Sequence, residues 1–147
     1  MSLTVEEHID IDVPPERVWD LVMDPERHGE WVTAHREVRD VPEGELAEGD
    51  GYRQILCLGG KRFEVDWELL ERDEPSLAVW KGKGPRGATS AVRYELARAN
   101  GGTRFDYTNE LDLPRGPLGA VARRVAGAPA RRQARKSLQL LKRALEG

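Results

Sequence analysis

The stretch from Pro117 to Glu146 constrains the fold of this chain most, because its apolar residues recur at helical spacing. Each half, on either side of Pro129, carries one apolar stripe, formed by Leu118, Val121, Ala122 and Val125 and then by Ala134, Leu138, Leu141 and Leu145. Proline lacks the amide hydrogen and clashes with the preceding turn, so we predict one long C-terminal helix that kinks or breaks at Pro129. Such a stripe must be buried against another layer of the protein.

The length and composition indicate one globular domain. The chain has 147 residues, and we expect residues 1–147 to share a single core. Hydrophobic residues make up 39% of the sequence, and no apolar run approaches the roughly 18 residues of a membrane span. The acidic, charged N-terminus does not have the pattern of a signal peptide, so a cytoplasmic location is expected. Cys57 is the single cysteine, which excludes an intrachain disulfide.

Upstream of the helix, apolar and polar residues alternate, as is typical of strands with one buried face. Residues 3–13 predict the first strand, and proline-initiated segments at 15–22 and 24–31 predict two short helices after it. Strands are also expected near 38–41 and at 52–58, where the pattern leaves the inward side of 52–58 open. Four further strands have clear inward positions: Phe63, Val65, Trp67 and Leu69; Ala78, Trp80 and Gly82; Ser90, Val92, Tyr94 and Leu96; and Thr103, Phe105, Tyr107, Asn109 and Leu111.

Four passages along the chain carry a family pattern: Ile9 to Trp19, Asp24-Pro25-Glu26 leading to Trp31, Gly102-Thr103-Arg104, and Ser137-Leu138 with Leu141-Lys142. In them the sequence resembles the START-like or SRPBCC superfamily, of the polyketide cyclase/dehydrase and lipid transport type. The resemblance implies an α+β helix-grip fold, in which a seven-stranded curved antiparallel sheet wraps around the long C-terminal helix. It indicates little about activity, because members share this architecture while their ligands and chemistries differ.

A space between the sheet and the helix is the expected site of function. A concave, mostly apolar cavity with a few polar groups is the usual form of a small-molecule site, and the small inward residues Ala78, Gly82 and Ser90 leave the space underfilled. The alternative is that the inward aromatic residues simply fill the core. With the resemblance, the pattern favours a pocket for a hydrophobic or aromatic molecule, such as a lipid, polyketide or related metabolite. The predicted ligand-binding residues are Glu7, Trp31, Phe63, Trp67, Trp80, Tyr94, Phe105, Tyr107, Asn109 and Leu138.

One polar cluster is predicted inside this space. Glu7 falls on the apolar side of the first strand, Tyr107 and Asn109 face inward on the last strand, and the helix-grip fold makes these strands neighbours. A buried carboxylate holds its proton more tightly, so Glu7 and Tyr107 are the candidate catalytic residues of an aromatase/cyclase-type enzyme. Alternatively, Glu7 reaches solvent at a strand end or makes a structural hydrogen bond. We expect no cofactor and no metal, because the three histidines lack the spacing of a ligand set.

Charge is distributed unevenly along the chain. Residues 115–147 hold nine Lys and Arg against Glu146, a net +8, whereas residues 1–114 carry −11. The simplest interpretation is a solvated helix face. The alternatives are peripheral membrane contact through the basic helix, or a protein-interaction module with an acidic partner. Nucleic acid is not an expected partner, because this helix interleaves no aromatic residues with its charges.

Overall fold

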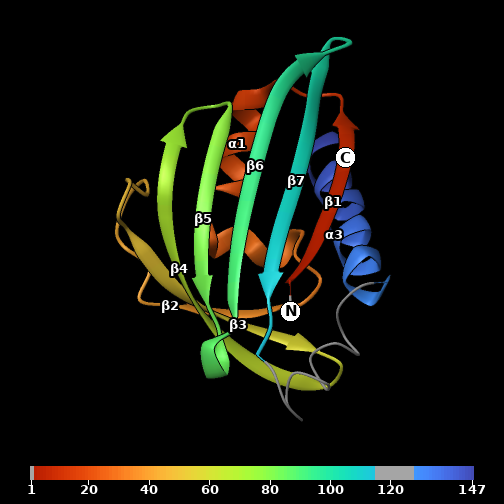
Figure 1. Ribbon diagram of the computed structural model, residues 1–147. Coiled ribbons are helices and arrows are strands. Elements are labelled where there is room, and N and C mark those ends of the chain that lie inside the picture. Colours follow the sequence, from red (N-terminus) through yellow and green to blue (C-terminus); the bar gives the residue numbers. More distant parts are fainter. Residues whose placement is uncertain (1, 115–127) are drawn as a thin grey trace.

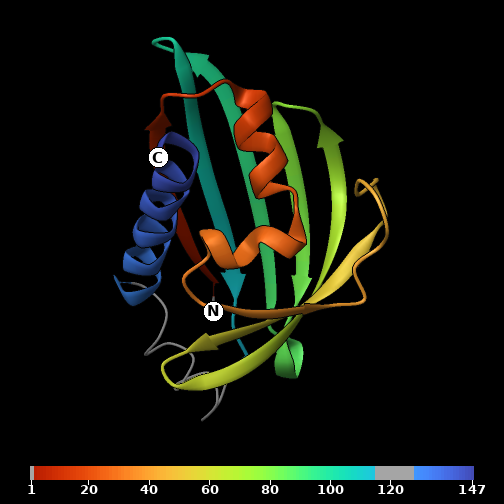
Figure 2. The ribbon, with the colours of Figure 1, turned by 180° about the vertical axis from the view of Figure 1, so that it is seen from behind.

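The alternating segments form one antiparallel sheet, in the order β1-β7-β6-β5-β4-β3-β2. The computed structural model describes residues 2–114 and 128–147, and the sheet curves into a half-barrel (Figures 1 and 2). The strands are β1 (Ser2–Ile11), β2 (His35–Arg39), β3 (Gly51–Leu58), β4 (Lys61–Asp73), β5 (Leu77–Lys83), β6 (Thr89–Ala99) and β7 (Gly102–Asp112). The predicted α+β helix-grip architecture is confirmed.

Two short helices follow β1, as predicted. Helix α1 (Pro15–Val22) buries its apolar face, and η1 (Pro25–Glu30) is a 3₁₀ helix. Asp24 caps η1, because its Oδ1 atom accepts a hydrogen bond from the amide of Glu26 at 3.0 Å. Figure 2 shows α1 and η1 lying across one face of the sheet. A third short helix, η2 (Pro85–Gly87), separates β5 from β6.

The C-terminal helix α3 (Ala128–Glu146) runs beside β1 on the same face of the sheet (Figure 2). Its buried residues are Ser137, Leu138, Leu141 and Leu145, so the second predicted stripe is confirmed. Its last turn is anchored to the end of β1. The Lys142 ammonium donates to the carbonyl of Asp10 at 2.7 Å, and the Glu146 carboxylate accepts from the amide of Asp12 at 2.8 Å. The first predicted stripe lies within residues 115–127, which are outside the described residues.

Turns and a bulge fix the register of the sheet. Gly59 and Gly60 join β3 to β4 with φ of 56° and 79°, the left-handed geometry that tight hairpins favour and that glycine adopts freely. Between Leu69 and Glu71 the β4–β5 register shifts, and the extra residue Leu70 is 43% exposed. Strands β1 and β7 are neighbours, with Glu7 opposite Tyr107.

The hydrophobic core lies between the sheet and the helices. Its most deeply buried side chains come from α1, α3 and the strands behind them: Ile11, Val18, Trp19, Leu21, Val22, Leu69, Thr103, Phe105 and Leu141. Among them, the Thr103 hydroxyl donates to the carbonyl of Val13 at 2.7 Å. The cavity described next is lined by residues of the β3–β4 hairpin, η2 and the first turns of α3, and some residues of the core also line it.

Candidate functional site

A cavity of about 990 Å³ lies between the concave face of the sheet and the helices η1 and α3. Eight of the ten predicted ligand-binding residues line it: Trp31, Phe63, Trp67, Trp80, Tyr94, Tyr107, Asn109 and Leu138. Strand alternation places the side chains from β4, β5, β6 and β7 on this face. Gly82 keeps part of the wall thin, because a Cβ there would lie 2.8 Å from the ring of Trp67.

The remaining two predicted residues lie outside the lining. Phe105 is fully buried in the core, where its ring centroid is 5.4 Å from that of Tyr94. The Glu7 carboxylate accepts a hydrogen bond from Nε of Arg135 on α3 at 2.8 Å, and 16% of its side chain is exposed. Glu7 therefore does not belong to the predicted polar cluster with Tyr107 and Asn109. Because α3 runs beside β1, the side chain of Arg135 reaches the Glu7 carboxylate and pairs with it.

Tyr107 and Asn109 do form a polar group in the cavity wall. The Asn109 Nδ2 atom donates to the Tyr107 hydroxyl at 3.2 Å, and the Ser90 hydroxyl donates to Asn109 Oδ1 at 2.6 Å. All three residues line the cavity. Burial raises the pKa of Tyr107, partly offset by the hydrogen bond from Asn109. The phenol therefore stays protonated at neutral pH.

A second polar group, which the sequence reasoning missed, comes from η1 and β3. Nε2 of His28 lies 2.7 Å from the Tyr52 hydroxyl, and both residues are buried and line the cavity. Burial lowers the pKa of His28 to about 3, aided by the neighbouring His35, so its imidazole is neutral at pH 7. Burial also raises the pKa of Tyr52. Both side chains are therefore uncharged at neutral pH, and one hydrogen bond joins them.

Strand β3 supplies the inward face that the sequence pattern left open. Tyr52, Gln54, Leu56 and Leu58 line the cavity. Gln54 bridges two other residues, since its Oε1 accepts from the Trp67 indole at 2.9 Å and its Nε2 lies 3.0 Å from Nδ1 of His35. The sequence pattern gave no facing for this strand, because Ile55 and Cys57 on the other side are apolar like Leu56 and Leu58. A lone histidine such as His28 gave no signal either.

Thr33, just after η1, connects to α3 beside the cavity. Its amide donates to the Ser137 hydroxyl at 3.1 Å, and its hydroxyl hydrogen-bonds the side chain of Gln133. All three residues line the cavity. These bonds hold the first half of α3 against the segment that carries His28 and Trp31.

The end of the cavity away from the core is rimmed by cations. Lys61 and Arg62 start β4, Lys83 ends β5 and Arg86 lies in η2, and all four line the opening. None of them forms an ion pair with another residue in the described ranges. Two acidic residues of the lining, Glu64 and Asp66, are instead paired with Arg53, at 4.0 and 2.9 Å. The rim is therefore positively charged while the interior is neutral.

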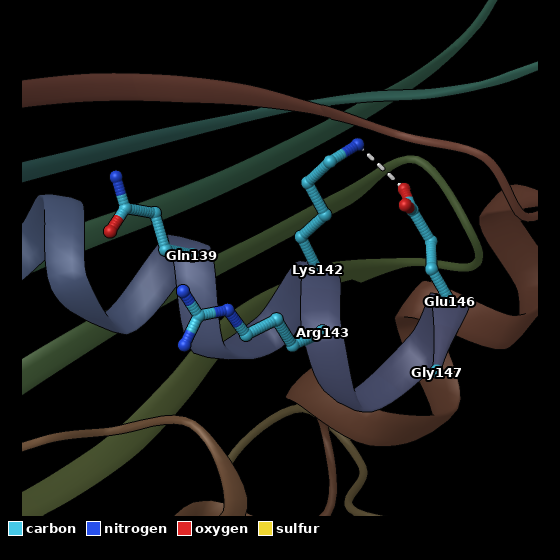
Figure 3. Close-up of a pocket in the computed structure, with 5 residues that line it drawn as sticks. All are labelled: Gln139, Lys142, Arg143, Glu146 and Gly147. Carbon is cyan, nitrogen blue, oxygen red and sulfur yellow. Dashed lines mark hydrogen bonds and ion pairs between the residues drawn. The ribbon is translucent and has the colours of Figure 1, made fainter.

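A smaller hollow of about 440 Å³ lies on the outer side of α3 (Figure 3). It is lined by Gln139, Lys142, Arg143, Glu146 and Gly147, and the Lys142 ammonium is 2.6 Å from the Glu146 carboxylate. These residues lie on the last turns of α3 and at Gly147, which directly follows the helix. The hollow lacks the converging side chains from several elements that distinguish a binding site.

Neither a metal-binding cluster nor a membrane-spanning helix is present among the described residues. In residues 2–114 and 128–147, no three His, Cys, Asp or Glu side chains are grouped so as to hold a metal ion. No helix in these ranges is long and apolar enough to cross a membrane.

A curved antiparallel sheet with a C-terminal helix over an apolar cavity defines a START-like, or SRPBCC, protein. Residues 2–146 match the family described as "Polyketide cyclase / dehydrase and lipid transport", and the chain belongs to this family. Solved structures with the same fold include TTHA0849 from Thermus thermophilus, with a TM-score of 0.79 and 20% identity over 98% of this chain and 97% of that one. Protein CV1439 from Chromobacterium violaceum has a TM-score of 0.71 at 18% identity, with 98% of each chain covered.

Two sequence relatives come from Mycobacterium tuberculosis strain ATCC 25618 / H37Rv. The uncharacterized protein Rv1546 is 28% identical over 123 residues, which cover 82% of this chain and 86% of the relative. A protein named Toxin Rv0910 is 26% identical over 133 residues, or 89% of this chain and 90% of the relative. The family relation indicates ligand binding. The kind of ligand has to be inferred from the residues that line the cavity.

Proposed function

We propose that this protein binds a hydrophobic or aromatic small molecule, such as a lipid, polyketide or related metabolite, in the cavity between sheet and helices. The observation that carries the proposal is the cavity itself, which at about 990 Å³ lies at the upper end of the usual range for ligand pockets. Burying about 300 Å² of apolar ligand surface there would contribute on the order of 7 kcal/mol before the costs of ordering. Apolar burial is therefore the main favourable term for binding, and it requires no ion pair.

The pKa directions favour binding over proton transfer in the same cavity. A general acid or base works best with a pKa near the working pH. Burial moves the described titratable groups of the interior the other way, lowering the pKa of His28 to about 3 and raising those of Tyr52, Tyr94 and Tyr107. An aromatase/cyclase-type reaction would need one of these groups to be retuned by its substrate.

Native mass spectrometry beside a denatured control tests the proposal, because a co-purified ligand is released only on denaturation. A thermal-shift panel of fatty acids, sterols and aromatic polyketides then identifies the chemical class, since a ligand that binds only the folded state raises the Tm. We expect at least one member of the panel to raise the Tm in a concentration-dependent manner.

A pair of variants on α3 provides the control. Ala134 lines the cavity, whereas Ala144 is exposed on the same helix. Ala134→Trp should fill part of the cavity and reduce the ligand-induced Tm shift, while Ala144→Trp should retain it. If no ligand raises the Tm and the protein instead associates with acidic partners in a salt-sensitive manner, the basic face of α3 would carry the function.

A further inference from the structure

The cations of residues 1–114 that lack an ion pair gather at the opening of the cavity. These residues hold fourteen Lys and Arg, since nine of the 23 in the chain lie in residues 115–147. Seven of the fourteen form ion pairs, and two arginines donate to backbone carbonyls. The other five are exposed and have neither kind of contact in residues 2–114 and 128–147. They are Lys81, which does not line the cavity, and the four residues of the cationic rim, which do: Lys61, Arg62, Lys83 and Arg86.

The cationic rim is spread over several elements. Lys61 and Arg62 start β4, whereas Lys83 at the end of β5 lies opposite Asp66, which is five residues further along β4 than Lys61. At about 3.3 Å per residue, the backbones of Lys61 and Asp66 are about 16 Å apart. One carboxylate or phosphate group pairs with cations within about 4 Å, so it would engage only part of the rim. Charges spaced in this way suit a surface that carries many anionic groups.

The acidic residues of the cavity lining do not cancel the charge of the rim. Glu64 and Asp66 both pair with Arg53, at 4.0 and 2.9 Å. At the other end of the sheet, Asp12 follows β1 and Asp73 ends β4, and both are exposed without an ion pair in the described part of the chain. Figures 1 and 2 show these strand ends far from the β3–β4 hairpin and η2. Although the net charge is −3, an anionic surface therefore attracts the cavity opening and repels the far end.

Apolar side chains lie between the charges of the rim. Leu58 lies opposite Lys61 in the β3–β4 register, and Pro85 is the first residue of η2. Leu58 and Phe63 are half-buried, Pro85 is exposed, and all three line the cavity. Cations beside partly exposed apolar side chains are typical of protein segments that lie on membranes. A bilayer offers anionic groups at its surface and an apolar layer beneath them, whereas an acidic protein would match only the charges.

We infer that the cationic rim docks this protein on an anionic lipid bilayer, with the opening of the cavity facing the membrane. The inference goes beyond the proposed function, because it assigns a partner to the surface around the opening and does not depend on which molecule the cavity holds. It also differs from membrane contact through the basic face of α3, because none of the cations on the described helix α3 lines the cavity.

Vesicle binding tests the inference with the full chain. The probes are vesicles of phosphatidylcholine alone and of phosphatidylcholine with about 30 mol% phosphatidylserine at pH 7.5, and flotation measures the bound fraction. We expect the protein to bind only the phosphatidylserine vesicles. Binding should fall at least about tenfold between about 0.1 and 0.5 M NaCl, because salt screens exposed charges. No binding to these vesicles at the lower salt concentration would overturn the inference.

Two matched variants locate the docking surface. The rim variant combines Lys61→Gln, Arg62→Gln, Lys83→Gln and Arg86→Gln. The α3 variant changes four exposed cations that have no ion pair in the described ranges, by Arg131→Gln, Arg132→Gln, Lys136→Gln and Arg143→Gln. Each variant removes four positive charges, so the two differ only in where the charges are lost. Because each cation near an anionic surface contributes about fivefold to binding, the rim variant should bind at least about 50-fold more weakly, and the α3 variant within about threefold of the unaltered protein.

A label on the single cysteine measures the orientation. Cys57 is half-buried on β3, opposite Arg62 in the β3–β4 register. An environment-sensitive fluorophore on Cys57 should shift its emission to shorter wavelength on phosphatidylserine vesicles. The matched control Cys57→Ser/Asp73→Cys carries the same fluorophore at the far end of the sheet, where the emission should not change. Because this comparison keeps the rim intact, it remains decisive if the rim variant does not fold.

The outcomes separate this inference from the proposed function. A rim variant that binds as well as the unaltered protein, or an α3 variant that loses as much binding as the rim variant, would overturn docking through the rim. Equal emission shifts at Cys57 and at position 73 would overturn the orientation. Failure of every ligand to raise the Tm would overturn the proposed function alone, because the vesicle test requires no cavity ligand.

Discussion

His28→Gln should remove much of the acid sensitivity of this protein's stability. The folded-state pKa of His28 is about 3, against 6.5 for the ordinary group, because burial disfavours the imidazolium. Between these values the unfolded chain binds the proton and the folded chain does not, so stability is complete above pH 6.5 and falls as the pH drops towards 3. From pH 7 to pH 5 this linkage costs about 2 kcal/mol of the free energy of unfolding.

Urea unfolding at pH 7, 6 and 5, followed by circular dichroism, measures this effect. Glutamine keeps a polar nitrogen near the Tyr52 hydroxyl but does not titrate, so the pH 7 to pH 5 loss should be smaller by about 2 kcal/mol in the variant. His35, whose pKa burial also lowers, contributes in both proteins and cancels in the comparison. His8→Gln is the control, because His8 is exposed on β1. The same pH dependence in His28→Gln and in the unaltered protein would refute the argument.

Three further substitutions test the fold and the site. Gly102→Ala should cost about 2 kcal/mol in urea unfolding, because its Cβ would collide with the carbonyl oxygen of Ile11, and an unchanged midpoint would contradict this close approach. Leu141→Ala should cost about 2–5 kcal/mol, since this side chain of α3 is fully buried; a loss below about 1 kcal/mol would mean that α3 is not packed as described. Glu7→Gln should cost less than about 1 kcal/mol and leave ligand-induced Tm shifts unchanged, because the carboxylate pairs with the exposed Arg135 and not with the cavity; a reduced shift would restore Glu7 as a site residue.

The strands with one buried face were predictable from local pattern alone. Phe63, Val65, Trp67 and Leu69 alternate with charged residues, and a one-residue slip would expose all of them, so their facing was predicted correctly. In β3 the pattern was uninformative, because Ile55 on the opposite side is also buried, at 4% exposure. Apolar residues on both faces of a strand carry no period, and only the packed sheet shows which face lines the cavity.

Local sequence pattern was sufficient for the element order, most strand facings, the apolar stripe of α3 and most of the residues around the cavity. These follow from periodicities of two and 3.6 residues, which are properties of neighbouring positions. The polar chemistry of the cavity, in contrast, depends on the packing of distant segments. Arg135 reaches Glu7 from 128 residues away, and His28 meets Tyr52 only because η1 packs over β3. Burial and hydrogen-bond partners are set by such contacts, so the Glu7 carboxylate pairs with Arg135 while the hydrogen-bonded pair of His28 and Tyr52 lines the cavity.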